Sequence, residues 1–139
     1  MTAKKFALEL NKEVLDSEEK IDNAIKLMAM FALRGVVQKS PVDTGRFRGN
    51  WIVSRHSPSK QTRKTPDKNG NQTIKKGAKV IERFKYKESI KLFEQSIIIQ
   101  NNLPYANRLE NGWSKTQAPH GMIAVTIAEM NVRYRNILI

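Results

Sequence analysis

The feature that most constrains this chain is a long apolar segment of helical periodicity that ends abruptly at Ser40-Pro41. Apolar residues recur at helical spacing from Ile21 to Ala32, which predicts an α-helix. Asp16 followed by Glu19 resembles a capping box and predicts that the helix begins near Ser17. The proline lacks a backbone N–H and disfavours helical geometry in the residue before it, so the helix has to end there.

The second half of this helix, from Leu27 to Val37, is apolar on almost every side, with Arg34 as the exception. A helix that faces water on one side carries a polar stripe, so this one is expected to be covered all round. A sheet, a first amphipathic helix over residues 3–15 or another subunit could cover it. We favour another subunit, because a small domain can hardly wrap a helix completely.

The residues after the proline predict a change from helix to turns and strands. Asp43-Thr-Gly45 has turn chemistry, since Asp and Thr bond nearby backbone groups and glycine accepts a positive φ. Arg46 and Arg48 alternate with Phe47, and Trp51 follows. This pattern predicts the start of a strand that carries guanidinium groups on one side and an aromatic anchor close behind.

The rest of the chain predicts short elements of both kinds. Strands are predicted at residues 51–53 and 95–100, and helices at residues 78–87, from Pro104 to Asn111-Gly112, and from Pro119 onward. The β-branched run Val125–Ile127 leaves a strand open for the first half of the final helix. With 139 residues, the chain predicts a single α+β domain, residues 1–139, in which N-terminal helices pack on a small, mainly antiparallel sheet.

The composition excludes several classes of protein. The chain has no cysteine, so it forms no disulfides, thiolate nucleophiles or sulfur-ligated metal sites. No apolar run approaches the roughly 18 residues that a membrane helix needs, and the N-terminus does not resemble a signal peptide. The expected setting is therefore a cytoplasm, or an assembly built there, with no membrane partner.

The net charge of +12 is concentrated in one segment. Residues 55–91 hold twelve basic and three acidic residues, a net of +9. Residues 55–80 predict a projecting basic arm, either a hairpin with its tip at Asn69-Gly70 or a loop that is disordered until bound. The arm is expected to meet an acidic partner or DNA through these side chains: Lys60, Arg63, Lys64, Lys68, Lys75 and Lys76.

A solvated loop and a charge-driven contact explain this arm equally well. Aromatic residues interleave with the charges only at Phe84 and Tyr86, so no base-stacking platform is predicted and sequence-specific reading of DNA is disfavoured. Nonspecific DNA binding through residues 55–91 is therefore the alternative function.

The sequence gives little support to catalysis. Asp43-Thr44-Gly45 is the triplet of aspartic proteases, but here it follows a helix end, and a turn is the better interpretation. His56 and His120 are isolated, with no ligand spacing for a metal and no nucleophile elbow nearby. We predict no enzyme activity, no metal and no cofactor.

Two stretches resemble a known family. They are Ser40-Pro-Val-Asp-Thr-Gly-Arg-Phe-Arg-Gly-Asn-Trp51 and Asn101-Asn-Leu-Pro-Tyr-Ala-Asn-Arg-Leu-Glu-Asn-Gly-Trp-Ser-Lys-Thr-Gln-Ala-Pro-His-Gly-Met122. In residues, order and spacing they resemble the head–tail joining proteins of long-tailed bacteriophages, the neck or tail-completion proteins often called minor tail protein Z-like. The resemblance covers roughly residues 21–130, but the basic insertion between the two stretches has no counterpart in it.

The resemblance implies a structural virion protein without catalysis, placed in the phage neck or tail after assembly in the host cytoplasm. Several copies, about six, would form a ring. The ring would lie between head connector or stopper proteins and tail terminator or tail tube proteins. Nonspecific contact with phage DNA is possible in such a place. Large aromatics beside charged groups are typical of subunit contacts, so the predicted contact residues are Arg46, Arg48, Trp51, Tyr105, Arg108, Glu110 and Trp113.

Overall fold

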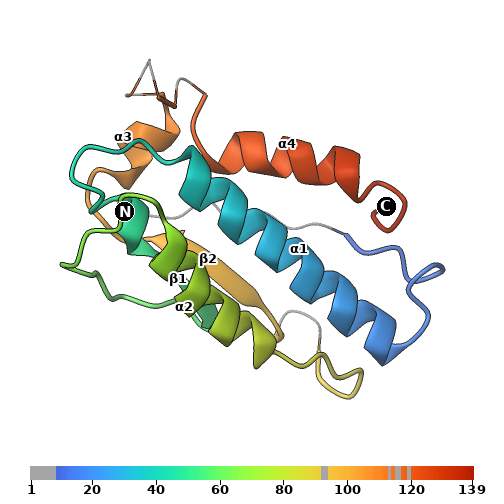
Figure 1. Ribbon diagram of the computed structural model, residues 1–139. Coiled ribbons are helices and arrows are strands. Elements are labelled where there is room, and N and C mark those ends of the chain that lie inside the picture. The colour runs from blue at the N-terminus through green and yellow to red at the C-terminus, as the bar shows by residue number, and fades with distance from the viewer. Residues whose placement is uncertain (1–8, 92–93, 113, 115–116, 119) are drawn as a thin grey trace.

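A computed structural model of the chain describes residues 9–91, 94–112, 114, 117–118 and 120–139. The described elements are four α-helices, one 3₁₀ turn and two strands: α1 (Glu18–Lys39), η1 (Arg48–Asn50), β1 (Trp51–Arg55), α2 (Asn71–Glu82), β2 (Ile97–Asn101), α3 (Ala106–Glu110) and α4 (Ile123–Arg133). The predicted α+β class is confirmed, with the long N-terminal helix packed on a small antiparallel sheet (Figure 1).

Helix α1 begins and ends where its sequence signals predict. Ser17 is the N-cap, and its hydroxyl accepts a hydrogen bond from the backbone N–H of Lys20. Asp16 lies one residue outside the cap and forms an ion pair with Lys20 at 2.9 Å. At the other end Ser40 has extended geometry, and its hydroxyl donates to the carbonyl of Val36 at 2.6 Å. Local chemistry therefore sets both ends of this helix.

Most of the cover of α1 comes from its own chain. The helix lies between α2 and α4, with the β1–β2 sheet behind it (Figure 1). A Cβ at Gly77 of α2 would come within 2.8 Å of Val53 and would also collide with Leu33, and one at Gly35 would lie 2.9 Å from the hydroxyl of Thr126 on α4. These glycines let the helices approach closely. Leu27 remains 58% exposed, so one strip of α1 is still open.

The helix predicted over residues 3–15 is wrong for the described part of that range. Residues 1–8 lie outside the described residues, and residues 9–15 contain no helix. Leu10 instead forms a bridge with Leu138, and the backbone N–H of Ile139 donates to the carbonyl of Glu9. Helical spacing of apolar residues was misleading here, because the segment buries Leu15 while pairing with the C-terminal residues.

The strand predicted from Arg46 begins later, at Trp51. The backbone N–H of Gly49 bonds to the carbonyl of Gly45, and that of Asn50 bonds to the carbonyl of Phe47. These bonds wind residues 45–50 into a turn and the 3₁₀ segment η1, so the two arginines do not alternate across a strand. β1 then pairs with β2 in antiparallel register from Trp51↔Asn101 to Arg55↔Ile97.

The basic segment forms a loop followed by a helix, and the predicted hairpin is wrong. Asn69-Gly70 stands at the start of α2, which begins at Asn71 and not at Ala78, and ends at Glu82. Gly70 is the N-cap, with a left-handed φ of 80°. The side chain of Asp67 supplies the missing cap: it accepts hydrogen bonds from the N–H of Gly70 and from the N–H and hydroxyl of Thr73.

The remaining helices predicted in the C-terminal part are present, but the last one begins at Ile123 and not at Pro119, which lies outside the described residues. α3 follows Pro104 and is capped by Asn111, and Gly112 has a φ of 86°. Residues 123–133 form helix α4, so the strand left open at Val125–Ile127 is not formed. The last helix buries Thr126 and Met130 against α1.

Candidate functional site: a groove between the two motif segments

The turn after α1 and the region of α3 lie side by side and enclose an open groove of about 370 Å³. This volume is near the lower end of what small-ligand pockets enclose. Two distant parts of the sequence line it: Pro41, Val42, Asp43, Thr44, Gly45, Arg46 and Phe47 on one side, and Tyr105, Arg108, Leu109, Ser114 and Gln117 on the other. These are the two stretches that carry the family resemblance.

Hydrogen bonds fasten the two sides of the groove to each other. The side-chain amide of Asn101 donates to the carbonyl of Phe47 at 2.9 Å. The side chain of Gln117 accepts from the N–H of Val42 at 2.7 Å and donates to its carbonyl at 3.4 Å. An amide side chain that bonds to both backbone groups of one residue holds it much as a neighbouring strand would.

The wall formed by residues 41–47 depends on Gly45. Its φ is 92°, and a Cβ added there would lie 2.7 Å from the backbone nitrogen of Lys68. Its carbonyl accepts hydrogen bonds from the N–H groups of Gly49 and Asp67. A side chain at this position would both strain the backbone and push the basic loop away.

The floor of the groove is aromatic. Phe47 is buried and lies between the rings of Trp51, at 5.8 Å in an edge arrangement, and Tyr105, at 5.9 Å. Trp51 is only 2% exposed, and its indole N–H donates to the hydroxyl of Ser40 at 2.6 Å. Trp51 is thus core, and the predicted role of this residue in a subunit contact has to be dropped.

Arg48 also differs from its predicted role. Its guanidinium donates to the carbonyls of Lys68 at 2.8 Å, Ser40 at 2.8 Å and Gln38 at 3.1 Å. Burial lowers the pKa of Arg48, and the nearby charge of Asp67 opposes that shift. The side chain joins the C-terminal end of α1 to the basic loop, where a cation suits the helix dipole. It is used inside the chain and is not free to meet a neighbour.

Glu110 is likewise used inside the chain. Its carboxylate accepts hydrogen bonds from the backbone N–H groups of Met122 at 2.9 Å, Ile123 at 2.8 Å and Ala124 at 3.0 Å. These are the first N–H groups of α4, which have no partner within that helix. Glu110 therefore caps α4 from a distance in sequence, and its predicted contact with a neighbouring subunit has to be withdrawn.

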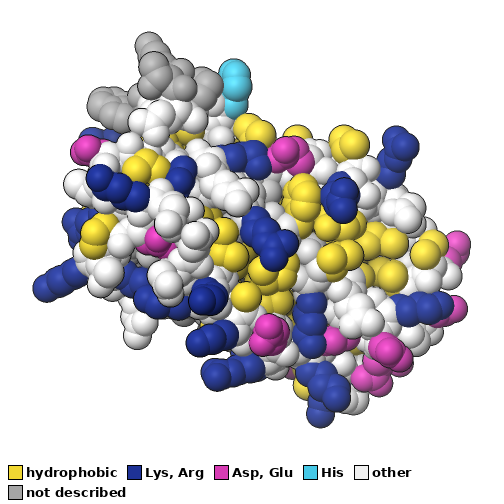
Figure 2. Space-filling view, in the orientation of Figure 1, with side chains coloured by type: hydrophobic (Ala, Val, Ile, Leu, Met, Phe, Trp, Pro, Cys, Tyr) yellow, Lys and Arg dark blue, Asp and Glu magenta, His cyan; other side chains and the backbone are white. Residues whose placement is uncertain are grey.

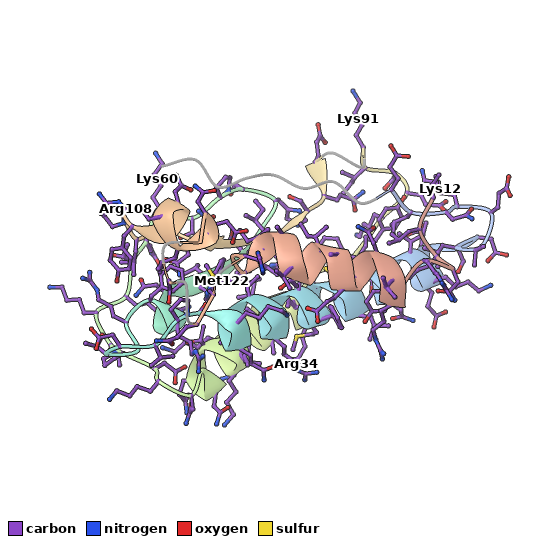
Figure 3. The ribbon with its side chains drawn as sticks, turned by 90° about the horizontal axis from the view of Figure 1, so that it is seen from above. Lys12, Arg34, Lys60, Lys91, Arg108 and Met122 are labelled. Carbon is purple, nitrogen blue, oxygen red and sulfur yellow. The ribbon has the colours of Figure 1, made fainter. Side chains whose placement is uncertain are left out.

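Three of the predicted contact residues lie at the groove surface. Arg46 is exposed, Tyr105 is 36% exposed, and Arg108 is exposed on α3 (Figure 3). Trp113 lies outside the described residues. With Asp43, the described lining carries two cationic groups and one anionic group. Such a surface suits a partner with acidic and aromatic or aliphatic groups.

The chain was compared with known proteins. It matches no family model, no curated protein and no solved structure. The resemblance to neck proteins therefore rests on the two motif stretches of the sequence alone.

The described residues offer no centre for metal chemistry, because no three His, Asp or Glu side chains among them come close enough to hold an ion. The groove lining that is described contains hydroxyl groups of Thr44 and Ser114 but no histidine to act as a base. No helix in the described ranges is long and apolar enough to span a bilayer.

The predicted basic arm is divided by the fold. Arg63 turns inward, where its guanidinium donates to the carbonyls of Gly49 and Trp51, and burial lowers its pKa against the opposing charge of Asp67. Lys60 lies on the side of the molecule opposite to Arg34 of α1 (Figure 3). The other members of the predicted set are exposed on the loop or on α2: Lys64, Lys68, Lys75 and Lys76. The segment therefore does not act as one arm.

Proposed function

We propose that this protein is a structural subunit of a long-tailed phage neck, which completes the tail and joins it to the filled head. The observation that carries the proposal is the juxtaposition of the two resembling stretches around one groove. They are separated by about a third of the chain, and yet Asn101 and Gln117 of the second bond to the backbone of the first. Two sequence stretches that serve the same subunit contact are expected to lie on one surface of the protein.

The groove supports a role in assembly. Its rim offers Arg46 and Arg108 as charged groups and Tyr105 as a partly exposed aromatic, the residue types that are enriched in subunit contacts. The exposed Leu27 on α1 adds an apolar group elsewhere on the surface. In the proposed assembly, copies of the chain form a ring, and the groove receives part of a neighbouring subunit or of an adjoining ring protein.

The test is complementation of a phage that lacks this protein, with Arg46→Glu as the variant and Arg135→Glu as a control of equal charge change. Both arginines are exposed, and neither side chain forms a hydrogen bond or an ion pair with the described residues. Thermal unfolding should match the unaltered protein for both. We expect Arg46→Glu to leave heads and tails unjoined and the control to restore infectious particles.

A normal yield of infectious particles with Arg46→Glu would show that the groove is not needed to join heads and tails. The mass of the unaltered protein in solution and in purified particles tests the broader claim. A protein that is monomeric in both, or that is missing from particles, contradicts a ring subunit.

A further inference from the structure

We propose that the outward face of α2 binds the phosphate backbone of double-stranded DNA through Lys75, Lys76, Lys79 and Arg83. At 3.6 residues per turn, these four side chains fall within about 100° of the helix circumference. All four are exposed, whereas the opposite side of the helix buries Thr73, Gly77 and Ile81. Figure 2 shows Lys and Arg side chains over α2, on the face of the molecule that also presents α1.

None of the four cations forms an ion pair within the described part of the chain. The ion pairs formed there involve Lys20, Lys26 and Lys39, all on α1. Glu82, the acidic residue of α2, is exposed at the edge of the basic face and leaves the face with an excess of positive charge. Like charges three and four residues apart destabilise a helix, so an external anion would relieve a repulsion that the fold leaves in place.

The helix that carries these charges is firmly held. Gly77 packs against Leu33 and Val53 so closely that a Cβ would collide with both. Asp67 caps the first turn, and the guanidinium of Arg55 donates to the carbonyl of Arg83 at the last. The positions of the charges are therefore set before a partner arrives, which lowers the entropic cost of binding.

The chemistry of the face favours contact with phosphates over contact with bases. The aromatic residues that follow α2, Phe84 and Tyr86, are 1% and 5% exposed and cannot stack on bases. Three of the four cations are lysines, whose ammonium groups act as point charges on flexible stems and lack the rigid bidentate fork of arginine. A purely electrostatic face binds best where charge is densest, and duplex DNA carries one charge per about 1.7 Å of its axis.

The geometry of the two partners is compatible. Lys75, Lys79 and Arg83 are each one turn apart, so they span about 12 Å along the helix axis. The same length of duplex carries about seven phosphate charges, counting both strands. The helix does not have to enter a groove of the DNA, because side chains of this length can reach the phosphates from a helix that lies across the DNA backbone.

Fluorescence anisotropy with a labelled 20-base-pair duplex of arbitrary sequence tests this inference, using the full chain between 50 and 200 mM salt. Four phosphate contacts predict a slope of log K against log salt of about −3.6, which is a loss of about 150-fold in affinity over this range. The variant Lys75→Gln/Lys76→Gln/Lys79→Gln should reduce the magnitude of that slope by about 2.7.

The matched control is Lys12→Gln/Lys20→Gln/Arg135→Gln, which removes the same charge from exposed residues outside α2. Lys12 lies far from α2 (Figure 3). Thermal unfolding of both variants verifies folding. The control should keep the slope of the unaltered protein. Equal losses in the two variants, absence of binding at 50 mM salt, or tighter binding to polyglutamate than to the duplex would each overturn the inference. None of these results depends on the groove or on Arg46.

Discussion

The side chain of Asn50 bonds to both backbone groups of Arg63, thirteen positions further along the chain: its amide donates to the Arg63 carbonyl at 2.9 Å and accepts from the Arg63 N–H at 2.6 Å. The amide also donates to the carbonyl of Arg46 at 2.6 Å. Asn50 is fully buried, so none of these groups can turn to water instead. One side chain thereby holds the basic loop against the start of β1.

Replacing Asn50 by alanine should lower the free energy of unfolding by about 2–4 kcal/mol, because several buried backbone groups lose their partners at once. Denaturant unfolding measures the change. Asn107→Ala, at an exposed position of α3 without side-chain bonds to the described residues, should stay within about 0.5 kcal/mol of the unaltered protein. A similar small change for Asn50→Ala would show that the loop is held by other contacts.

Replacing Asp67 by asparagine should destabilise α2 by about 1 kcal/mol at neutral pH, because a charged cap of its first turn is lost. Burial opposes ionisation of Asp67, but hydrogen bonds from Thr73 and the backbone N–H groups of Gly70 and Gln72 outweigh it and hold the pKa of this carboxyl below its ordinary value. The stabilisation is therefore fully present above the unfolded pKa of about 3.9 and is lost as pH falls through the folded pKa.

Denaturant midpoints measured between pH 7 and pH 2 test the role of Asp67. The difference between the unaltered protein and Asp67→Asn should be constant near neutrality and should shrink below about pH 4. Asp43→Asn is the control, since Asp43 is exposed and forms no bond through its carboxylate with the described residues. A difference that does not change with pH would assign the effect to side-chain shape and not to charge.

Replacing Glu110 by alanine should cost about 2 kcal/mol, because three backbone N–H groups at the start of α4 lose a charged acceptor. Hydrogen exchange should show the loss first in the amides of residues 122–126. Glu88→Ala, on an exposed turn, serves as the control. If the exchange of these amides is unaltered in Glu110→Ala, other groups cap α4.

Replacing Arg48 by alanine should destabilise the monomer by about 2–3 kcal/mol, whereas Arg46→Ala should leave its stability within about 0.5 kcal/mol. Arg48 bonds to three carbonyls, and Arg46 is exposed. Thermal unfolding of the two single variants separates these effects. Equal stability of the two variants would mean that the hydrogen bonds of Arg48 between α1 and the basic loop contribute little. Arg48 would then again be a candidate for contact with a neighbouring subunit.

The elements that local sequence predicts are those whose signals lie within the elements themselves. Ser17 and the Ser40-Pro41 pair mark the two ends of α1, and the isoleucine run marks β2. The start of α2 was missed because its cap comes from Asp67, several residues outside the helix. The spacing of Asp67, Gly70 and Thr73 is a signal that could have revealed it, had the Asn-Gly pair not favoured a hairpin.

The candidate site was only partly predictable. The groove residues Arg46, Tyr105 and Arg108 were named from sequence together with Arg48, Trp51 and Glu110. Trp51 belongs to the core, and Arg48 and Glu110 bond to backbone groups of their own chain. A charged or aromatic side chain looks alike in sequence whether its partner is a neighbouring subunit or a backbone group of its own chain. The sequence does not show which partner such a side chain contacts, because backbone groups that are close in the fold can be far apart along the chain.

By itself, the sequence determined the long helix and its ends, the two strands, the α+β class and the concentration of positive charge, because caps, periodicity and composition act over a few residues. Only the tertiary structure decided which charged side chains remain exposed and which form hydrogen bonds with backbone groups of the same chain. That outcome depends on groups tens of residues apart, such as Glu110 with α4 and Arg48 with the loop, whose hydrogen bonds exist only once the helices have packed on the sheet.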